Sequence, residues 1–401
     1  MKNIKITTAL LAILFGISLG AFATKKSKET VSIPTVEVRG GVYYLELDAV
    51  TPYNRGIQHG TAMKLVIKKT LSQFENWLRN YANTQDPDQM IKNFVKSTGH
   101  VASVKKDLPD LYSEMKGIAD GAEVDFNKLF VYQSFDELFL YLIKSGQVAI
   151  NEGHCTTTGI FNRSSQPNYV THNNDIPIYH EGAVTVLKIK YPNSDLEILQ
   201  QTFAGQIGQN GVNNYGVSVG VNTIADLPTT SYGIPVSFKV RKILESKNTE
   251  QAYQFLKNTS AGTAMNFMIG DREKVIAVET WEQNAKILAQ TGEGFNVHTN
   301  HSLQEDAPVT FKMDPSSGGG SYSYTQQRYA LVKKTLQQCS DTIGFEGVRA
   351  LKMTKPILVY PGSPTGRTIM CMIVEIPKKG KPTLYTTPDS PNLHEHVKFE
   401  F

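Results

Sequence analysis

The sequence predicts a layered α+β fold in which helices cover stacked β-sheets. Two observations carry this prediction. The chain before Cys155 has mainly helical spacing of apolar residues, and the chain after it reads mainly as strands interrupted by helices in two clusters. Many strands with two groups of helices favour stacked sheets with outer helical layers. With 401 residues, 40% hydrophobic and 19% charged, the chain forms one large or two fused globular domains.

The N-terminus has the pattern of a secretory signal peptide over residues 1–23. Met1–Lys5 is positively charged, Ile6–Leu19 is nearly all apolar, and Ala21–Ala23 supplies small residues at a cleavage position. The alternative is an uncleaved membrane anchor, which the short apolar run disfavours. We therefore expect export to the periplasm or the outside of the cell, and a mature protein that does not span the membrane.

Charge and composition give no reason to expect nucleic acid as a partner. The formal charge of +4 is small, and removal of residues 1–23 would lower it by two because they contain Lys2 and Lys5. The sequence has no long basic run and no interleaving of basic and aromatic residues.

Before Cys155, a polar lead-in over Thr24–Val36 precedes one strand and three helical blocks. The strand is Val42–Leu47, and the first helical pattern opens at Arg55–Gly60. The second block follows Asp86-Pro87, and the third starts at Leu108-Pro109, where proline suits a first helical turn.

After Cys155, strands predominate, and turns rich in Pro, Asn and Gly separate them. A loop is expected at Pro315–Ser321, whose glycines and serines cannot hold regular structure. Helices are expected at Val236–Ser246, Thr249–Lys257 and Thr325–Gln338. Strands are expected at Tyr169–Asn173, Ala183–Tyr191, Leu196–Phe203, Val217–Val221, Ala264–Ile269, Val275–Trp281, Lys286–Gln290, Phe295–Thr299, Thr368–Glu375 and Thr383–Thr387.

Cys155 is a candidate nucleophile. If the bond before it were cut, its own α-amine, with an ordinary pKa of roughly 7.7–8, would accept the thiol proton at neutral pH. The alternative is a small buried hydrophobe. The cysteine count is three, which leaves at least one thiol unpaired, and spacing does not establish whether Cys339 pairs with Cys371. No Cys/His metal pattern is present, so we expect no metal and no cofactor.

Two other groups of residues have alternative interpretations. His59 and His100 are possible catalytic bases, although a single His in a helix is more often structural. An apolar cluster is a possible acyl pocket, although such clusters are more often core; it comprises Phe135, Leu138, Phe139, Tyr141 and Leu142.

Five blocks, in order, resemble the isopenicillin N acyltransferase-like (acyl-CoA:6-aminopenicillanic acid acyltransferase) family of N-terminal-nucleophile hydrolases. The blocks are Leu111–Ala122 (LYSEMKGIADGA), Cys155–Thr157 (CTT), Gly205–Val217 (GQIGQNGVNNYGV), His298–His301 (HTNH) and Ser323–Arg328 (SYTQQR). The resemblance covers about residues 56–391 and extends more distantly to penicillin V acylases, bile salt hydrolases and acid ceramidase. It implies a four-layer αββα sandwich with a mainly helical N-terminal segment.

The resemblance also implies roles for individual residues. Cys155 matches the nucleophile, and Asp175 matches the aspartate that accepts a hydrogen bond from its freed amine. Asn222 and Asn300 match the amides around the oxyanion, where neutral donors stabilise developing charge. Arg328 matches an arginine that lowers the thiol pKa. For Asn222 a turn role, and for Arg328 an exposed position on its helix, remain the alternatives.

The processing junction departs from the family pattern. The family often has Gly-Cys there, whereas this chain has His154 between Gly153 and Cys155. Glycine adopts strained backbone geometry without a Cβ penalty, which His154 cannot do as easily. The expected product of cleavage is a signal peptide (1–23), a mainly helical α-chain (24–154) and a catalytic β-chain (155–401), the last two remaining associated.

The predicted function is therefore that of an exported, self-cleaving cysteine hydrolase that acts on a linear amide, or transfers its acyl group, through a thioester on Cys155. The expected partners are small N-acyl amides: acylated amino acids or peptides, β-lactam side chains, bile-acid conjugates or long-chain amides. Alternatives are a lipid-directed hydrolase similar to phospholipase-B-like proteins or ceramidase, and a secreted binding protein that is never cut.

Overall fold

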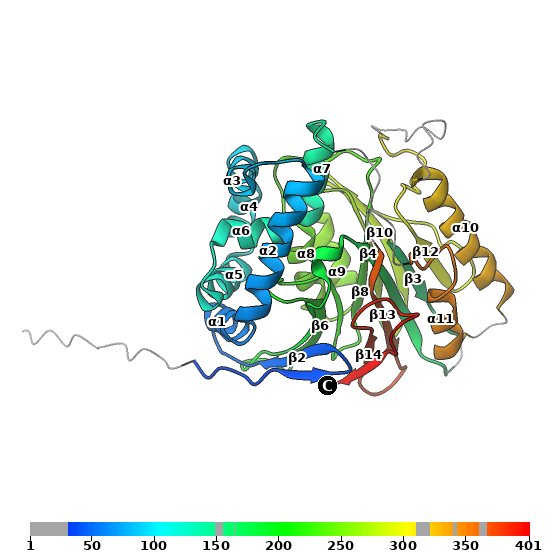
Figure 1. Cartoon of the computed structure of the whole chain (residues 1–401). Helices are drawn as coiled ribbons and strands as arrows, with labels where there is room; N and C mark the ends of the chain where they lie inside the picture. Colours follow the sequence, from blue (N-terminus) through cyan, green and yellow to red (C-terminus); the bar gives the residue numbers. More distant parts are fainter. Residues whose placement is uncertain (1–30, 149–154, 164, 310–320, 340–342, 361–366) are drawn as a thin grey trace, which may run out of the picture. The chain divides into compact units, whose positions relative to one another are not determined.

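Two β-sheets lie face to face at the centre of the structure, a computed structural model (Figure 1). It describes residues 31–148, 155–163, 165–309, 321–339, 343–360 and 367–401, and residues 31–401 form one compact unit. Neighbouring strands pair antiparallel, except that β2 and β5 run parallel. The nine-stranded sheet has the order β1 (Glu37–Arg39), β2 (Val42–Leu47), β5 (Val184–Lys190), β6 (Glu197–Phe203), β7 (Asn210–Asn213), β8 (Ser218–Thr223), β9 (Met265–Gly270), β10 (Val275–Trp281) and β11 (Asn284–Ile287). The six-stranded sheet has the order β12 (Phe295–His298), β3 (Thr156–Ile160), β4 (Asn168–Ile176), β13 (Arg367–Ile376), β14 (Thr383–Thr386) and β15 (Val397–Glu400).

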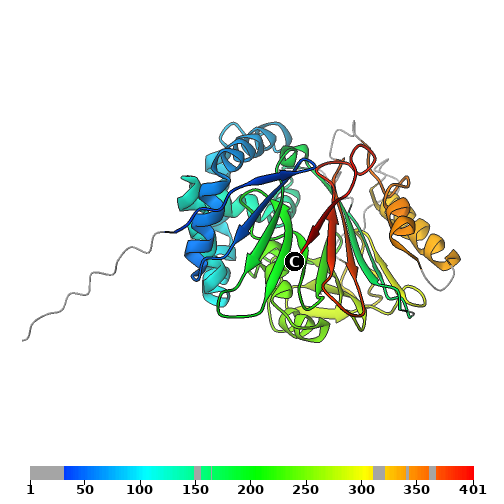
Figure 2. The same ribbon diagram turned by 90° about the horizontal axis from the view of Figure 1, so that it is seen from below.

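Helices cover the outer face of each sheet, which confirms the predicted four-layer αββα arrangement (Figure 1, Figure 2). α8 and α9 pack on the nine-stranded sheet, with the N-terminal helices on the same side, while α10 and α11 pack on the six-stranded sheet. The helices are α1 (Pro52–Ala62), α2 (Lys64–Tyr81), α3 (Pro87–Ser97), α4 (His100–Asp107), α5 (Pro109–Ala122), α6 (Phe126–Gln133), α7 (Phe135–Lys144), α8 (Val236–Leu244), α9 (Thr249–Lys257), α10 (Ser321–Gln338) and α11 (Phe345–Lys352), with a short 3₁₀ turn at Ile178–His180. None of the helices in the described ranges is both long and apolar enough to cross a bilayer.

Local capping fixes where several helices begin. Thr51 accepts a hydrogen bond from the backbone of Asn54 and precedes Pro52, so α1 starts three residues before the predicted Arg55. Asp86 caps α3 in the same way and is likewise followed by proline. These signals are short side-chain-to-backbone contacts that hydrophobic spacing does not detect.

Glycines bring α1 and α5 into close contact. A Cβ added to Gly56 would lie 2.0 Å from the carbonyl oxygen of Glu114, and one added to Gly117 would lie 2.1 Å from that of Tyr53. The glycines of the Leu111–Ala122 block are therefore required for backbone packing between two helices.

The two helical histidines have structural roles. His59 is buried, and its Nε2 accepts a hydrogen bond from the backbone N–H of Gly205, while Nδ1 of His100 bonds to Gly233 O. Burial lowers the pKa of His59 to about 4. Both rings are therefore held as neutral hydrogen-bonding groups within the fold.

The proposed acyl-pocket cluster is part of the hydrophobic core. Phe135, Leu138, Phe139 and Leu142 are buried, and Tyr141 packs against them. They form the inner side of α7, where the ring of Phe135 meets that of Trp77 in α2 edge-on. The core interpretation of this cluster is the one that the structure supports.

The three cysteines are all free, so Cys339 and Cys371 do not form a disulfide. Cys339 is exposed at the end of α10, and Cys371 is buried within β13. The signal segment 1–23, most of the Pro315–Ser321 loop and the junction residue His154 lie outside the described residues. The predicted α-chain and β-chain segments share one sheet, because β2 from the first pairs with β5 from the second.

Candidate active site

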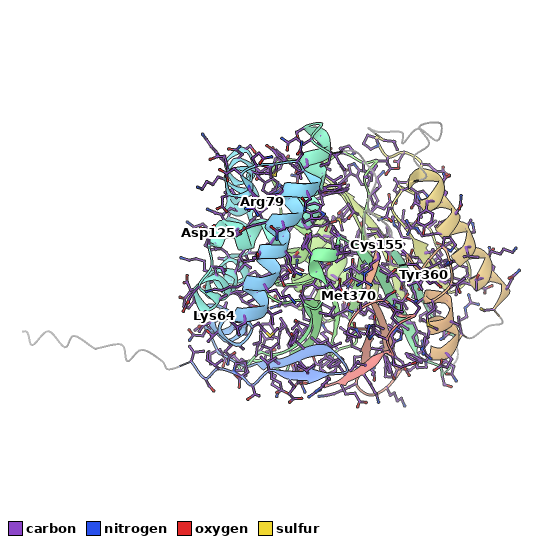
Figure 3. The ribbon with its side chains drawn as sticks, in the orientation of Figure 1. Lys64, Arg79, Asp125, Cys155, Tyr360 and Met370 are labelled. Atoms are coloured by element: carbon purple, nitrogen blue, oxygen red, sulfur yellow. The ribbon has the colours of Figure 1, made fainter. Side chains whose placement is uncertain are left out.

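Cys155 directly precedes β3, at the end of the pairing between β3 and β4 in the six-stranded sheet, where Thr156 pairs with Asn173. The side chain of Thr157 contacts Asn222 of the other sheet, whereas that of Thr156 contacts Arg328 of the outer helix α10. Because side chains alternate along a strand, Cys155 faces inward, between the two sheets, with Thr157. Its Sγ lies 3.6 Å from Oδ1 of Asn174, and 8% of the residue is exposed (Figure 3).

Arg328 connects three parts of the site. Its Nη1 donates to the carbonyl oxygen of Cys155 at 2.6 Å and to Oγ1 of Thr156 at 2.8 Å, and its Nη2 donates to Oδ1 of Asn300 at 2.9 Å. The side chain is completely buried, so it is not an exposed residue of its helix. A planar guanidinium with several fixed donors is suited to hold acceptors from three segments at once.

Asp175 lies at the end of β4, opposite Thr368 of β13. Its Oδ1 accepts a hydrogen bond from Thr368, and its buried Oδ2 has no partner among the described residues. Burial raises the pKa of Asp175 to about 8, although the cations of Arg328 and Lys352 act in the opposite direction. The carboxyl group of Asp175 therefore has one oxygen without a hydrogen-bond partner among the described residues of a buried site.

The Cys155 thiol has a pKa well above its ordinary value in the uncut chain. Burial is the main cause, and the negative charge of Asp175 adds to it; the backbone N–H of Asp175 and the charge of Arg328 act against it. A thiolate in this site therefore needs a nearby proton acceptor or a further positive charge.

Asn222 and Asn300 approach the site from different layers. Oδ1 of Asn222 accepts from Thr157 and from Asn266, which turns its Nδ2 away from both, and this buried Nδ2 has no partner among the described residues. Nδ2 of Asn300 donates to Thr223 O at 3.1 Å, and its Oδ1 faces Arg328. Asn222 thus presents a free amide donor, whereas the Asn300 amide already has partners on both sides.

The structure therefore brings together Cys155, Asp175, Asn222, Asn300 and Arg328, which are up to 173 positions apart in the chain. Sequence reasoning missed four polar residues that hold them in place. Thr157 and Asn266 orient Asn222, Thr368 bonds to Asp175, and buried Lys352 donates to Thr156 O at 3.0 Å. Thr157 belonged to the recognised Cys-Thr-Thr block, but single polar residues on distant strands and helices carry no local signal.

Two further features lie outside this cluster. An open pocket of about 840 Å³ lies between the start of α5 and the ends of α8 and α9, and none of the five predicted site residues lines it. Within the described residues, no three metal-ligating side chains gather in one place.

Two known proteins are similar to this chain in sequence. An acyltransferase from Emericella nidulans, "Acyl-coenzyme A:6-aminopenicillanic-acid-acyltransferase 40 kDa form", is 26% identical over 268 residues, which cover 66% of this chain and 71% of that protein. A "Beta-alanyl-dopamine/carcinine hydrolase" from Drosophila melanogaster is 26% identical over 246 residues, which are 58% of this chain. This chain spans 59% of the length of the Drosophila protein.

Solved structures are also similar. The conjugated bile acid hydrolase of Clostridium perfringens, in a mutant form, gives a TM-score of 0.42 with 13% identity, covering 62% of this chain and 92% of that one. An N-acylethanolamine-hydrolyzing acid amidase ortholog from Caenorhabditis elegans gives 0.42 with 14% identity, covering 62% and 100%.

A family model described as "Acyl-coenzyme A:6-aminopenicillanic acid acyl-transferase" matches residues 161–388, more than half of the chain. The match includes Asp175, Asn222, Asn300 and Arg328, and it begins shortly after Cys155. It confirms the resemblance drawn from the five sequence blocks. The chain therefore belongs to the acyl-coenzyme A:6-aminopenicillanic acid acyl-transferase family and is an enzyme of the acyltransferase and amidohydrolase class.

Proposed function

We propose that this protein is an exported cysteine amidohydrolase that cuts itself between His154 and Cys155 and then attacks a linear amide with the Cys155 thiolate. The observation that carries the proposal is the set of contacts made by Arg328. One buried guanidinium holds the carbonyl of Cys155, and through Asn300 it reaches a second segment that matches the family pattern.

Self-cleavage would proceed by an acyl shift from nitrogen to sulfur. The sulfur of Cys155 attacks the carbonyl carbon of His154, the peptide C–N bond breaks, and the released nitrogen takes up the proton lost by the thiol to become the α-amine of Cys155. Water then hydrolyses the thioester and leaves a new carboxyl group on His154. The two chains stay together because β2 and β5 belong to one sheet and one core.

In the cut enzyme, the α-amine of Cys155 is the general base. It accepts the thiol proton, the thiolate attacks the amide carbonyl of the substrate, and the leaving amine takes that proton as the C–N bond breaks. The Nδ2 of Asn222, buried and without a partner among the described residues, would donate to the oxygen that becomes negative. Hydrolysis of the thioester by water returns the free thiol.

Asp175 provides the carboxylate that holds the α-ammonium group. Its Oδ2 is buried and unpartnered among the described residues, so an ammonium donor next to it would supply the missing hydrogen bond. The new positive charge would lower the pKa of Asp175 from about 8, and Asp175 would in turn raise that of the amine.

The proposed substrates are linear amides with a small acyl or amine part: acylated amino acids or peptides, β-lactam side chains, bile-acid conjugates or long-chain N-acyl amides. Hydrolysis is favoured over transfer because an exported enzyme has no evident supply of coenzyme A. The Drosophila relative is named a hydrolase and the Emericella relative an acyltransferase, so both outcomes have precedent among relatives.

The test is to trap the acyl-enzyme. The protein is mixed with a panel of these amides, quenched in acid, and the peptide that contains Cys155 is weighed by mass spectrometry. The expected result is a mass increase equal to the acyl group on Cys155, which hydroxylamine removes, with no increase on exposed Cys339. Absence of an adduct and of amine release across the whole panel would contradict the proposal and favour a binding protein.

A further inference from the structure

A buried lysine, Lys352, reaches the nucleophile's strand from the outer helical layer. It is the last residue of α11, none of its side chain is exposed, and its Nζ donates to the carbonyl oxygen of Thr156 at 3.0 Å. Its own carbonyl oxygen accepts a hydrogen bond at 2.9 Å from Nδ2 of Asn173, the residue that pairs with Thr156 in the sheet. Lys352 is therefore hydrogen-bonded to both β3 and β4, at the residue pair that follows Cys155.

A buried ammonium group is expensive unless a negative charge lies close by. Among the described residues, no carboxylate forms an ion pair with Lys352, and the carbonyl oxygen of Thr156 is the one hydrogen-bond acceptor of its Nζ. The groups whose negative charge favours its cation are the thiol of Cys371 and then Asp175. Arg328 and the ring of His172 face it as well.

Lys352 and Arg328 form a pair around the nucleophile. Arg328 holds the carbonyl of Cys155 and Lys352 holds the next carbonyl along the chain, that of Thr156. The positive charges of both residues also act to lower the pKa of Asp175. In the uncut chain, where no α-ammonium group exists, Arg328 and Lys352 are two buried cations that act on the carboxyl group of Asp175.

We propose that Lys352 is a positioning residue for Cys155: its hydrogen bond fixes the start of β3, and its positive charge supports the ionised forms of Asp175 and of the Cys155 thiol. The inference rests on the proposed function, because it assumes that the thiolate of Cys155 is the reactive species. It adds a residue from α11 to a site otherwise built from the two sheets and α10.

The pH dependence follows from the charge. Burial holds the pKa of Lys352 at about 8, so the side chain is mostly protonated at neutral pH. Asp175 and the thiol titrate as a coupled pair, and loss of a nearby positive charge raises both macroscopic pKa values. Asp136 faces the thiol and Tyr324 faces Asp175, and both remain in every variant proposed below.

The experiment measures alkylation of Cys155 by iodoacetamide against pH, resolved by peptide mass because Cys339 and Cys371 are also present. Three variants separate the hydrogen bond from the charge. Lys352→Met removes both, Lys352→Gln keeps a donor without charge, and Lys352→Arg keeps the charge. Lys239→Met is the matched control. Lys239 lies on α8, is also buried, and donates a hydrogen bond to the backbone carbonyl of Thr259.

At pH 7, where Lys352 of the parent is mostly protonated, Lys352→Met and Lys352→Gln are expected to be alkylated roughly tenfold more slowly, and the difference should shrink above pH 8, where Lys352 loses its own charge. Lys352→Arg should stay within about threefold of the parent, and Lys239→Met should leave the profile in place even if it unfolds more easily. A profile unchanged in Lys352→Gln would overturn the inference, as would a loss of rate of equal size in Lys239→Met.

The alkylation result for Lys352 can be interpreted independently of whether the proposed function is correct. Alkylation can be followed in the uncut chain as well as in the cut one, and needs no substrate. If the parent protein is never cut and hydrolyses no amide, the proposed function fails while the Lys352 profiles still report on the thiol. If it is cut and active but the profiles coincide, the inference alone fails.

Discussion

The guanidinium of Arg328 donates a hydrogen bond of 2.6 Å to the carbonyl oxygen of Cys155. This contact joins an outer helix to the residue at which we expect the chain to be cut. It also fixes the backbone on the C-terminal side of the proposed scissile bond. The buried cation is thus placed both to hold the nucleophile and to offset the negative charge that develops in the site.

Replacement of Arg328 tests this contact. Arg328→Ala leaves three buried acceptors without a donor, so we expect the free energy of unfolding to fall by about 3 kcal/mol or more, together with loss of self-cleavage. Arg328→Lys should retain part of the stability but lose at least tenfold in cleavage rate, because one ammonium cannot reproduce the fork of donors. Urea unfolding and gel densitometry measure the two effects.

Arg349→Lys is the control for Arg328→Lys. Arg349 pairs with Glu346 and Glu395 at the surface of α11, and such pairs contribute little. We expect its stability and cleavage rate to match the parent. A cleavage rate in Arg328→Lys equal to that of Arg349→Lys would contradict the role of the buried guanidinium.

Asn222 should matter for the transition state more than for substrate binding. Asn222→Ala removes the free amide donor, and we expect kcat to fall by roughly 100- to 1000-fold with KM little changed. Asn213→Ala is the control, because Asn213 is a buried asparagine whose side-chain hydrogen bonds among the described residues all go to backbone groups: Nδ2 donates to the carbonyls of Leu244 and Ser246, and Oδ1 accepts from the N–H groups of Tyr215 and Val217. It should lose stability but keep kcat per folded molecule; a similar loss of kcat in both variants would count against the oxyanion role.

Thr157 is expected to act through Asn222. Its hydroxyl donates to Oδ1 of Asn222, which leaves the Nδ2 of that residue facing the site. Thr157→Val keeps the shape and removes the donor, so the amide is free to turn, and kcat should drop by about tenfold. In the Asn222→Ala background the same change should have no further effect, which a double-mutant cycle on kcat measures.

Asp175 should make the uncut chain less stable as pH rises. Burial sets its pKa at about 8 in the folded chain, against an ordinary value near 3.9 when unfolded. The folded state therefore keeps the proton that the unfolded state releases, so this contribution to stability is complete below pH 4 and is lost as pH rises towards 8.

In a Cys155→Ala background, which stays uncut, Asp175→Asn should reduce the fall of unfolding free energy between pH 5 and 7 by about 1.4 kcal/mol per pH unit. Urea titrations at pH 5, 6 and 7 measure it. Burial also raises the pKa of Glu137 to about 8, so Glu137 lowers stability in the same direction as pH rises. Because Glu137 is present in both chains, its contribution cancels in the comparison. Parallel pH curves for the two chains would show that Asp175 is ionised throughout.

The sequence was sufficient to predict the layers because most strands and many helices carry their own hydrophobic period, although the short strands β1, β3, β7 and β15 were not predicted. It also led to the five residues that the structure brings together: Cys155, Asn300 and Arg328 lie in the five blocks, and Asp175 and Asn222 follow from the family pattern beside them. It did not predict Lys352, which lies at the end of a short helix with no motif, or Asn266, whose role depends on pairing between β8 and β9. Such contacts arise from tertiary packing, and nothing near them in the chain signals them.

The most direct test of the account is the intact mass and N-terminal sequence of the purified protein beside a Cys155→Ala variant. We predict two fragments for the parent, residues 24–154 and 155–401, the second beginning at Cys155, and one chain from Thr24 for the variant. A parent protein that remains a single uncut chain would contradict self-cleavage, remove the proposed base and return Cys155 to a structural role.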